Sequence, residues 1–254
     1  MALSMNCKNC GNLVEENFCG NCGQSIKISR INFSGFINDL SDSVFQVNRG
    51  LFFTIWELIV RPGIAIKNFL QGKRKPYFKP FAFLLTTSTF YFLLAEFTDQ
   101  STWLDSFYSG WISGASDLNQ ESNAEKVLSW FVYNFRISTL FLLPVYSFAC
   151  FLSFRKFGFN FLEFIVINCY VSGQQALIYG ICTLGEALFQ NQLFESSSFF
   201  LSTGYAFWVF WKLFDQAKPA GRVFRTLLTY LLYLTFGTLL LFAAMAVITL
   251  AQKI

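Results

Sequence analysis

The stretch RPGIAIKNFLQGKRKPYFKP, residues Arg61–Pro80, separates two parts of the chain that differ in composition. A polar part with paired cysteines precedes it, and long apolar runs follow it. The stretch contains six basic residues and no acidic residue: Arg61, Lys67, Lys73, Arg74, Lys75 and Lys79. A basic cluster beside an apolar run of bilayer length is typical of a cytoplasmic loop, and each Lys or Arg near the surface adds about 1 kcal/mol of attraction to anionic lipids. We therefore expect this stretch, which we call the collar, to contact anionic lipid where a cytosolic module meets a membrane domain.

The composition of the whole chain is that of a membrane protein. Hydrophobic residues make up 54% of the sequence and charged residues 13%, whereas charged residues are about 25% of a typical soluble domain. The charges are also segregated, and the tracts between them are long enough to cross a bilayer. These features predict an all-α integral membrane protein.

The sequence lacks the residue sets of common catalytic sites. It has no histidine, which is the usual general base and the commonest metal ligand. It also shows no pair of catalytic carboxylates, no Ser/His set and no phosphate-binding loop. We therefore expect the protein not to be an enzyme.

Two CxxC units, separated by eight residues, lie near the N-terminus. Their cysteines are Cys7, Cys10, Cys19 and Cys22, and a glycine follows each unit. A CxxC turn brings two thiolates together, and two such turns complete a closed zinc site of four cysteines. Met1–Gly20 lack the apolar core of a secretory signal, which favours the reducing cytosol, where cysteine pairs bind metal more often than they form disulfides. The pattern favours a structural Zn²⁺ site over the alternatives of a redox pair or a disulfide.

This ribbon, residues 1–30, is too small to form an apolar core of its own. Bound metal would supply most of its folding free energy, which is about 10–16 kcal/mol in zinc-finger peptides. Three basic and two acidic residues lie within it: Lys8, Lys27, Arg30, Glu15 and Glu16. This balance disfavours nucleic acid as a partner. We expect the ribbon to have a structural role or to dock a cytosolic protein partner.

Residues 31–80 join the ribbon to the first apolar run and contain helical patterns. One helix face is formed by Phe33, Phe36, Ile37, Leu40 and Val44. Further helices are expected over Val44–Val60, which ends before Pro62, and over Ile64–Gln71, which ends at Gly72. The sequence leaves two arrangements open. The first is amphipathic helices that lie along the cytosolic membrane interface or pack under the bundle; the second is ordinary helix faces buried against each other.

Three features of residues 7–80 occur together: the double CxxC start, Thr54 followed by Leu58, and the pattern Pro62-Gly63-x-x-Ile66-x-x-Phe69-Leu70-x-Gly72-Lys73-Arg74-x-x-Tyr77-x-x-Pro80. With these features the chain resembles a family of bacterial membrane proteins that joins an N-terminal zinc ribbon to a multi-pass domain of unknown function. Beyond residue 80 only the hydropathy is similar. The resemblance implies an architecture; it implies no activity and no catalytic residues.

Five apolar runs are found after the collar: Phe81–Phe97, a run within Leu128–Phe154, Phe161–Leu184, Phe199–Phe214 and Val223–Leu250. With the N-terminus inside, the cytosolic segments carry twelve basic residues and the outer segments carry two, which follows the positive-inside rule. Omitting the fourth run would move four basic residues to the outer side. We therefore expect residues 81–254 to form five transmembrane helices in the cytoplasmic (inner) membrane, with the C-terminus outside.

The third run contains polar residues at the depth of the bilayer centre. They are Ser172, Gln174 and Gln175, and Asn168 and Tyr179 share a helix face with Gln175. An amide without a partner in hydrocarbon is costly, so we expect hydrogen bonds between helices or a polar pathway for a ligand or permeating molecule. At the start of the same run Glu163 lies close to Arg155 and Lys156, which predicts an interfacial ion pair.

These observations lead to two hypotheses for the function. The first is a non-enzymatic membrane scaffold or regulator that acts through the cytosolic ribbon. The alternative is a channel, small transporter or membrane-perturbing effector in which Gln174 and Gln175 face a pathway. Five spans with few polar residues make a poor pore in a monomer, so the alternative requires a homo-oligomer. Membrane lipids are partners under both hypotheses.

Overall fold

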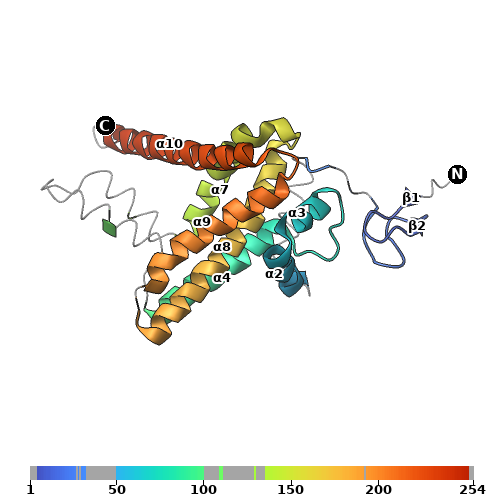
Figure 1. Ribbon diagram of the computed structural model, residues 1–254, viewed down its shortest axis with the longest axis horizontal. Helices are drawn as coiled ribbons and strands as arrows, with labels where there is room; N and C mark the ends of the chain where they lie inside the picture. The colour runs from blue at the N-terminus through green and yellow to red at the C-terminus, as the bar shows by residue number, and fades with distance from the viewer. Residues whose placement is uncertain are drawn as a thin grey trace, which may run out of the picture.

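The computed structural model describes residues 5–26, 28, 30–32, 50–99, 109–110, 129, 135–191 and 193–251. Over these residues the chain is mainly helical, with a small two-stranded sheet near the N-terminus (Figure 1). The strands are β1 Met5–Asn6 and β2 Leu13–Val14, which pair antiparallel. The helices are α2 Gly50–Val60, α3 Pro62–Leu70, α4 Pro80–Thr98, α7 Phe135–Phe154, α8 Phe161–Phe189, α9 Leu193–Leu213 and α10 Pro219–Ala251, with a short 3-10 helix at Arg155–Phe157. The helix face predicted over Phe33–Val44 lies outside the described residues.

Helices α4, α8 and α9 lie side by side and form the centre of a bundle (Figure 1). Helices α8 and α9 are antiparallel, because Gln175 contacts Ser202 while Gly185, further along α8, lies against Phe194 at the start of α9. Helix α9 therefore returns to the end of the bundle at which α8 begins.

Local sequence sets the boundaries of these helices. Helix α4 begins at Pro80, whose fixed φ suits the first turn and which has no N–H group to leave unsatisfied. Helix α8 begins with a capping box, in which Asn160 and Glu163 each accept a hydrogen bond from the other's backbone N–H group. Asp99 and Gln190 end α4 and α8 in the left-handed conformation.

The largest hydrophobic core lies at the end of the bundle next to the collar and is rich in phenylalanine. Phe154 at the end of α7 stacks on Phe214, which follows α9, with ring centroids 4.1 Å apart. Phe210 of α9 joins the same cluster. Phe69 of α3 meets Tyr170 of α8 edge to face at 5.5 Å. This core therefore fixes α3 of the collar to the helices of the bundle.

Three of the described helices are long and apolar enough to cross a membrane: α4, α8 and the Pro219–Ala244 part of α10. They contain the first and third apolar runs and most of the fifth. The second run reaches into α7 and the fourth lies in α9, which carries Glu195 in its first turn and Lys212 in its last turn. Helical segments of membrane-spanning length are thus confirmed, and the count of five remains a prediction.

The C-terminal part of α10 extends away from the other helices (Figure 1). Leu239, Leu240 and Phe242 are each more than half exposed. Side chains of this kind are compatible with a lipid environment, because hydrocarbon covers an apolar helix surface without the need for protein partners.

Helices α2 and α3, before and within the collar, follow the sequence patterns closely. Helix α3 begins at Pro62, two residues before the expected start, since proline suits the first helical turn. It ends just before Gly72, whose φ of +104° is the left-handed geometry expected of a glycine after a helix. The hydroxyl of Thr54 in α2 accepts a hydrogen bond from the N–H of Phe78 at 2.8 Å. This bond ties α2 to the segment that leads into α4.

Candidate metal centre

The two CxxC units fold into knuckles with the same backbone hydrogen bonds. In the first, the N–H of Gly11 donates to the carbonyl of Cys7 at 2.8 Å; in the second, the N–H of Gly23 donates to the carbonyl of Cys19 at 2.7 Å. The N–H of each leading cysteine donates to the carbonyl of the residue after the glycine, at 2.8 Å in both knuckles. Both glycines have positive φ, +81° and +69°, which glycine adopts without strain. The glycine after each unit therefore closes the turn that presents the thiols.

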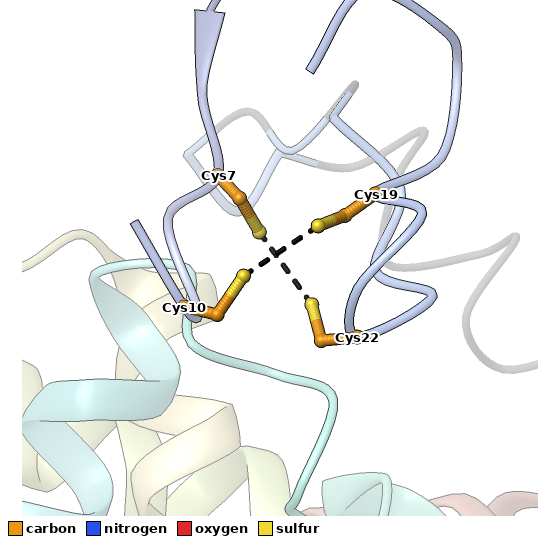
Figure 2. Close-up of side chains that lie close together, drawn as sticks. All are labelled: Cys7, Cys10, Cys19 and Cys22. Carbon is orange, nitrogen blue, oxygen red and sulfur yellow. Dashed lines mark hydrogen bonds between the residues drawn. The ribbon is translucent and has the colours of Figure 1, made fainter. Parts of the chain in front are cut away.

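The four cysteine side chains of the knuckles point toward a common centre (Figure 2). Their Sγ atoms all lie within 4.8 Å of one another. The Sγ atoms of Cys7 and Cys22 are 3.6 Å apart, and those of Cys10 and Cys19 are 3.5 Å apart. The four cysteines are therefore close enough together to bind one metal ion.

Hydrogen bonds around the site favour the thiolate form at two of the cysteines. The backbone N–H of Asn12 is the main cause of the lowered pKa of Cys10. At Cys22 burial alone would raise the pKa, but hydrogen bonds, above all from the Asn9 side chain, lower it to about 6. The thiolate is the form that binds metal. At Cys19 the backbone hydrogen bonds from Cys22 and Asn21 act in the same direction, but burial and the neighbouring thiols of Cys10 and Cys22 raise its pKa to about 11. The knuckle backbone and its asparagines therefore favour the thiolate at Cys10 and Cys22 only.

One glutamine, Gln24, joins the second knuckle to the collar. Its side chain is almost fully buried. The Nε2 group donates to the carbonyl of Gly72 at 3.0 Å, and Oε1 accepts from the backbone N–H groups of Arg74 at 3.0 Å and Lys75 at 3.1 Å. Both ends of the amide are satisfied, as a buried amide requires. Gln24 thus connects the second knuckle to the collar through three hydrogen bonds.

The first knuckle contacts the collar at Gly72. A Cβ atom on Gly72 would lie 2.8 Å from Cδ of Lys8 and 3.2 Å from Cγ2 of Ile28. The ammonium of Lys8 in turn donates to the carbonyl of Ile28 at 2.9 Å. Gly72 is therefore required twice, for its positive φ and for the close approach of the ribbon.

A second connection runs from the end of the ribbon to the start of α8. The guanidinium of Arg30 pairs with the carboxylate of Glu163 at 2.7 Å and donates to the carbonyl of Gly158 at 2.6 Å. The Asn160 side chain donates to the carbonyl of Ile31 at 3.1 Å. The ion pair expected at Glu163 forms, but its partner is Arg30 and not a basic residue of the preceding loop. The reason is that the segment after the ribbon passes over the first turn of α8.

Arg61 and Lys67 of the collar form ion pairs with described residues. Arg61 binds Glu57, four residues before it, at 2.6 Å. Lys67 binds Asp215 at 2.8 Å, and this hydrogen bond is the main cause of the lowered pKa of Asp215. The second pair joins α3 to the connection between α9 and α10.

The other four basic collar residues differ in exposure. Lys73 and Lys75 are exposed, whereas Arg74 and Lys79 are half-buried. The guanidinium of Arg74 lies over the ring of Phe69, 5.4 Å from its centroid. Lys73 and Lys75 are therefore more open to the surroundings than Arg74 and Lys79.

The polar residues predicted within α8 have different surroundings. Gln175 donates to the carbonyl of Ser202 on α9 at 3.0 Å, which is the interhelical hydrogen bond that the sequence favours. Gln174 is buried, and its Oε1 atom has no hydrogen-bond partner among the described residues. Ser172 is half-buried. Only one of the two amides is thus satisfied by a neighbouring helix.

The sequence contains no signal for the contacts of Gln24 and Arg30. Their partners Gly72 and Glu163 lie 48 and 133 residues further along the chain. A CxxC spacing indicates a metal site, but it does not show which surface the knuckle touches.

Comparison with known proteins gives one match. Residues 48–92 match the model of a family described as "Protein of unknown function (DUF3667)". No curated protein and no solved structure matches the chain. The matched residues contain α2, the whole collar including α3, and the first part of α4. The resemblance to an uncharacterised family is thus confirmed over the collar, and in residues 48–92 this chain carries the sequence pattern of that family of unknown function.

Proposed function

We propose that this chain is a non-enzymatic, multi-pass membrane protein that acts as a scaffold or regulator through a zinc-bound cytosolic ribbon. The observation that carries the proposal is the hydrogen bonding of Gln24, which joins the second knuckle to three backbone groups of the collar. A ribbon of this size depends on its metal for order, so the metal determines whether Gln24 is in position. Metal loss, or a protein partner that binds the ribbon, would then act on the membrane helices through the collar.

Zinc is the ion that we assign to the four cysteines. A tetrahedral zinc–thiolate site has Zn–S bonds of about 2.3 Å and therefore sulfurs about 3.8 Å apart. The separations of 3.5 and 3.6 Å between opposed thiols are close to that value. All four ligand positions come from the protein, which is typical of a structural site and leaves none open for a substrate.

Removal of the metal should expose the collar to trypsin. Trypsin cleaves after Lys73 and Arg74 only when this segment leaves the ribbon, because cleavage requires local opening of the chain. We expect chelation, or Gln24→Ala, to raise the cleavage rate at these two bonds about tenfold, since three backbone groups of the collar lose their partner. The rate is measured on detergent-solubilised protein by mass spectrometry of the fragments.

The exposed neighbour Gln71 supplies the matched control for this experiment. Gln71→Ala should leave the cleavage rate unchanged, and Gln24→Ala should retain its metal. Collar cleavage that does not change when the metal is released would contradict the proposed link.

We also propose that α4, α7, α8, α9 and α10 are the five spans, with the N-terminus in the cytosol and the C-terminus outside the cytoplasmic membrane. Contacts at one end of the bundle support this arrangement. The ribbon reaches the loop before α8 through Arg30, and the collar reaches the loop after α9 through Lys67. These basic segments therefore lie on one side, as the positive-inside rule requires. Helix α9 runs antiparallel to α8 and returns to that side. If α8 crosses the membrane, α9 must therefore cross it as well.

Fusions at the two ends of the chain would check the number of spans. Green fluorescent protein at the N-terminus should fluoresce, and alkaline phosphatase after Ile254 should be active, because an odd number of crossings places the ends on opposite sides. Phosphatase after Lys156 should be inactive. Both ends on the same side would exclude five spans.

Lipid contact at the cytosolic face is a further part of the proposal. Phe52 and Trp56 of α2 are 80% and 65% exposed, and the exposed Lys73 and Lys75 lie in the collar that follows. An exposed apolar helix face close to basic residues is suited to the interface of an anionic membrane. We therefore propose anionic lipids as partners of the collar. The small number of basic residues in the ribbon disfavours nucleic acid as a partner.

A further inference from the structure

One face of α8 is polar over much of its length. Asn168, Ser172, Gln175 and Tyr179 follow one another at spacings of four, three and four residues, which places them on one side of the helix. The amide of Asn168, which is fully buried, donates to the hydroxyl of Ser147 on α7 at 3.1 Å. Polar groups of α8 and α7 thus meet inside the bundle.

The same face of α8 meets α9 further along. Gln175 donates to the carbonyl of Ser202, and the hydroxyl of Ser202 donates to the Tyr179 oxygen at 2.7 Å. We use the name polar seam for the five residues that make these bonds between helices: Ser147, Asn168, Gln175, Tyr179 and Ser202. The seam therefore joins α7, α8 and α9 through polar side chains.

Two tyrosine hydroxyls beside the seam contact each other but make no well-formed hydrogen bond to another described residue. The rings of Tyr146 on α7 and Tyr230 on α10 are 6.2 Å apart, and their hydroxyls interact with one another. Both hydroxyls are nevertheless buried without a hydrogen bond of good geometry to any residue that the structure describes. Cys150 links these tyrosines to the seam, because it packs in the same core cluster as both tyrosines and its Sγ is 3.7 Å from Oδ1 of Asn168. Buried polar groups of this kind require a partner that donates and accepts.

The charge of the surroundings restricts what that partner can be. The helix segments around the seam contain no charged residue: 137–154, 164–185, 196–211 and 226–251. An ion would lack a counter-charge there. A small neutral molecule could instead form hydrogen bonds with the hydroxyls of Tyr146 and Tyr230. We propose that the seam and the adjoining tyrosines form a hydrated site for small uncharged molecules that donate and accept hydrogen bonds. This site is independent of the ribbon and adds a ligand to the proposed scaffold or regulator.

Two native cysteines allow a direct test, since both are fully buried but in different surroundings. Cys150 also belongs to a hydrophobic core, but its Sγ lies 3.7 Å from Oδ1 of Asn168 in the seam, whereas Cys169 packs in an apolar cluster with Leu84, Leu143 and Ile165. The full chain in lipid nanodiscs is treated with hydroxyethyl methanethiosulfonate, an uncharged probe with a hydrogen-bonding group, and in parallel with methyl methanethiosulfonate. Peptide mass spectrometry gives the rate at each cysteine. The ratio of the two rates cancels the intrinsic reactivity of each thiol.

We expect the hydroxyethyl-to-methyl ratio to be about tenfold larger at Cys150 than at Cys169, because a hydroxyl group is unfavourable in apolar surroundings without a partner. Equal ratios would show a dry seam and would overturn the proposal. A cationic trimethylammonium-ethyl probe should label Cys150 more slowly than the hydroxyethyl probe. Equal labelling by these two probes would refute the restriction to uncharged molecules.

A second pair of positions covers the case in which Cys150 reacts with neither probe. Ser202→Cys places a thiol in the seam at almost unchanged volume, and Ala206→Cys places one a turn further along α9 in the apolar core. The same difference in ratio is expected between these variants. Equal ratios at this pair would overturn the proposal as well.

Discussion

Replacement of Cys19 by serine is expected to remove the bound metal and the order of the ribbon together. Cys19 is buried, and its Sγ lies 3.5 Å from that of Cys10. Loss of one thiolate opens a site whose metal supplies about 10–16 kcal/mol in comparable peptides, which is as large as the stability of a whole small domain. Metal content per chain, measured by plasma mass spectrometry on purified protein, should fall from one zinc to almost none.

A cysteine outside the ribbon provides the control. Cys182 is buried in α8 and has no part in the cluster, so Cys182→Ser should keep one zinc per chain. Full occupancy in Cys19→Ser, or wild-type protein that carries no metal, would contradict a four-cysteine site. One iron per chain in place of zinc would refute the choice of ion but not the site.

The metal cluster is the part of the structure that the sequence predicts best. All four ligands lie within Cys7–Cys22, and each knuckle needs only a tight turn closed by a glycine such as Gly11 or Gly23. Local geometry of this kind depends on few distant contacts. The C-terminal end of α3 was predictable for the same reason, since Gly72 determines it.

Contacts between distant segments could not be predicted in the same way. The nearest basic residues in the sequence suggested the wrong partner for Glu163, because the position of Arg30 depends on how the ribbon lies on the bundle. The helical spacing places Asn168 and Gln175 on one face of α8, but only the packing of α7 and α9 supplies Ser147 and Ser202 as their partners. Periodicity shows which residues share a face; it does not show what that face meets.

The count of spans shows the limit of hydropathy. Helix α9 is serine-rich at its start and ends near Lys212, so its composition is less apolar than that of α8. Its antiparallel packing on α8, and not its hydropathy, is the reason to count it as a span. In the sequence, only the loop charges favoured the fourth run as a span. The contacts of α9 with α8 add a second argument for this proposed span.

Substitution of Gly63 by alanine should separate the collar from the membrane helices. A Cβ atom at Gly63 would lie 2.6 Å from the backbone carbon and oxygen of Lys212 and 2.9 Å from the backbone nitrogen of Leu213. These are backbone atoms at the end of α9 and cannot rotate away as a side chain could. Overpacking of a tight contact costs about 1–3 kcal/mol, and the displacement of α3 would also break the ion pair between Lys67 and Asp215. Thermal unfolding of the solubilised protein, followed at a fixed scan rate, should show a clear fall in midpoint.

The matched control for this substitution is Gly204→Ala in α9. No atom lies within 4 Å of the position of its Cβ, and alanine favours a helix over glycine by up to about 1 kcal/mol. Its midpoint should therefore stay the same or rise. The two variants add the same methyl group, and they differ in whether a second helix end lies against it. Equal midpoints would mean that α3 does not rest on the end of α9; the collar would then have no direct route by which the state of the ribbon reaches that helix.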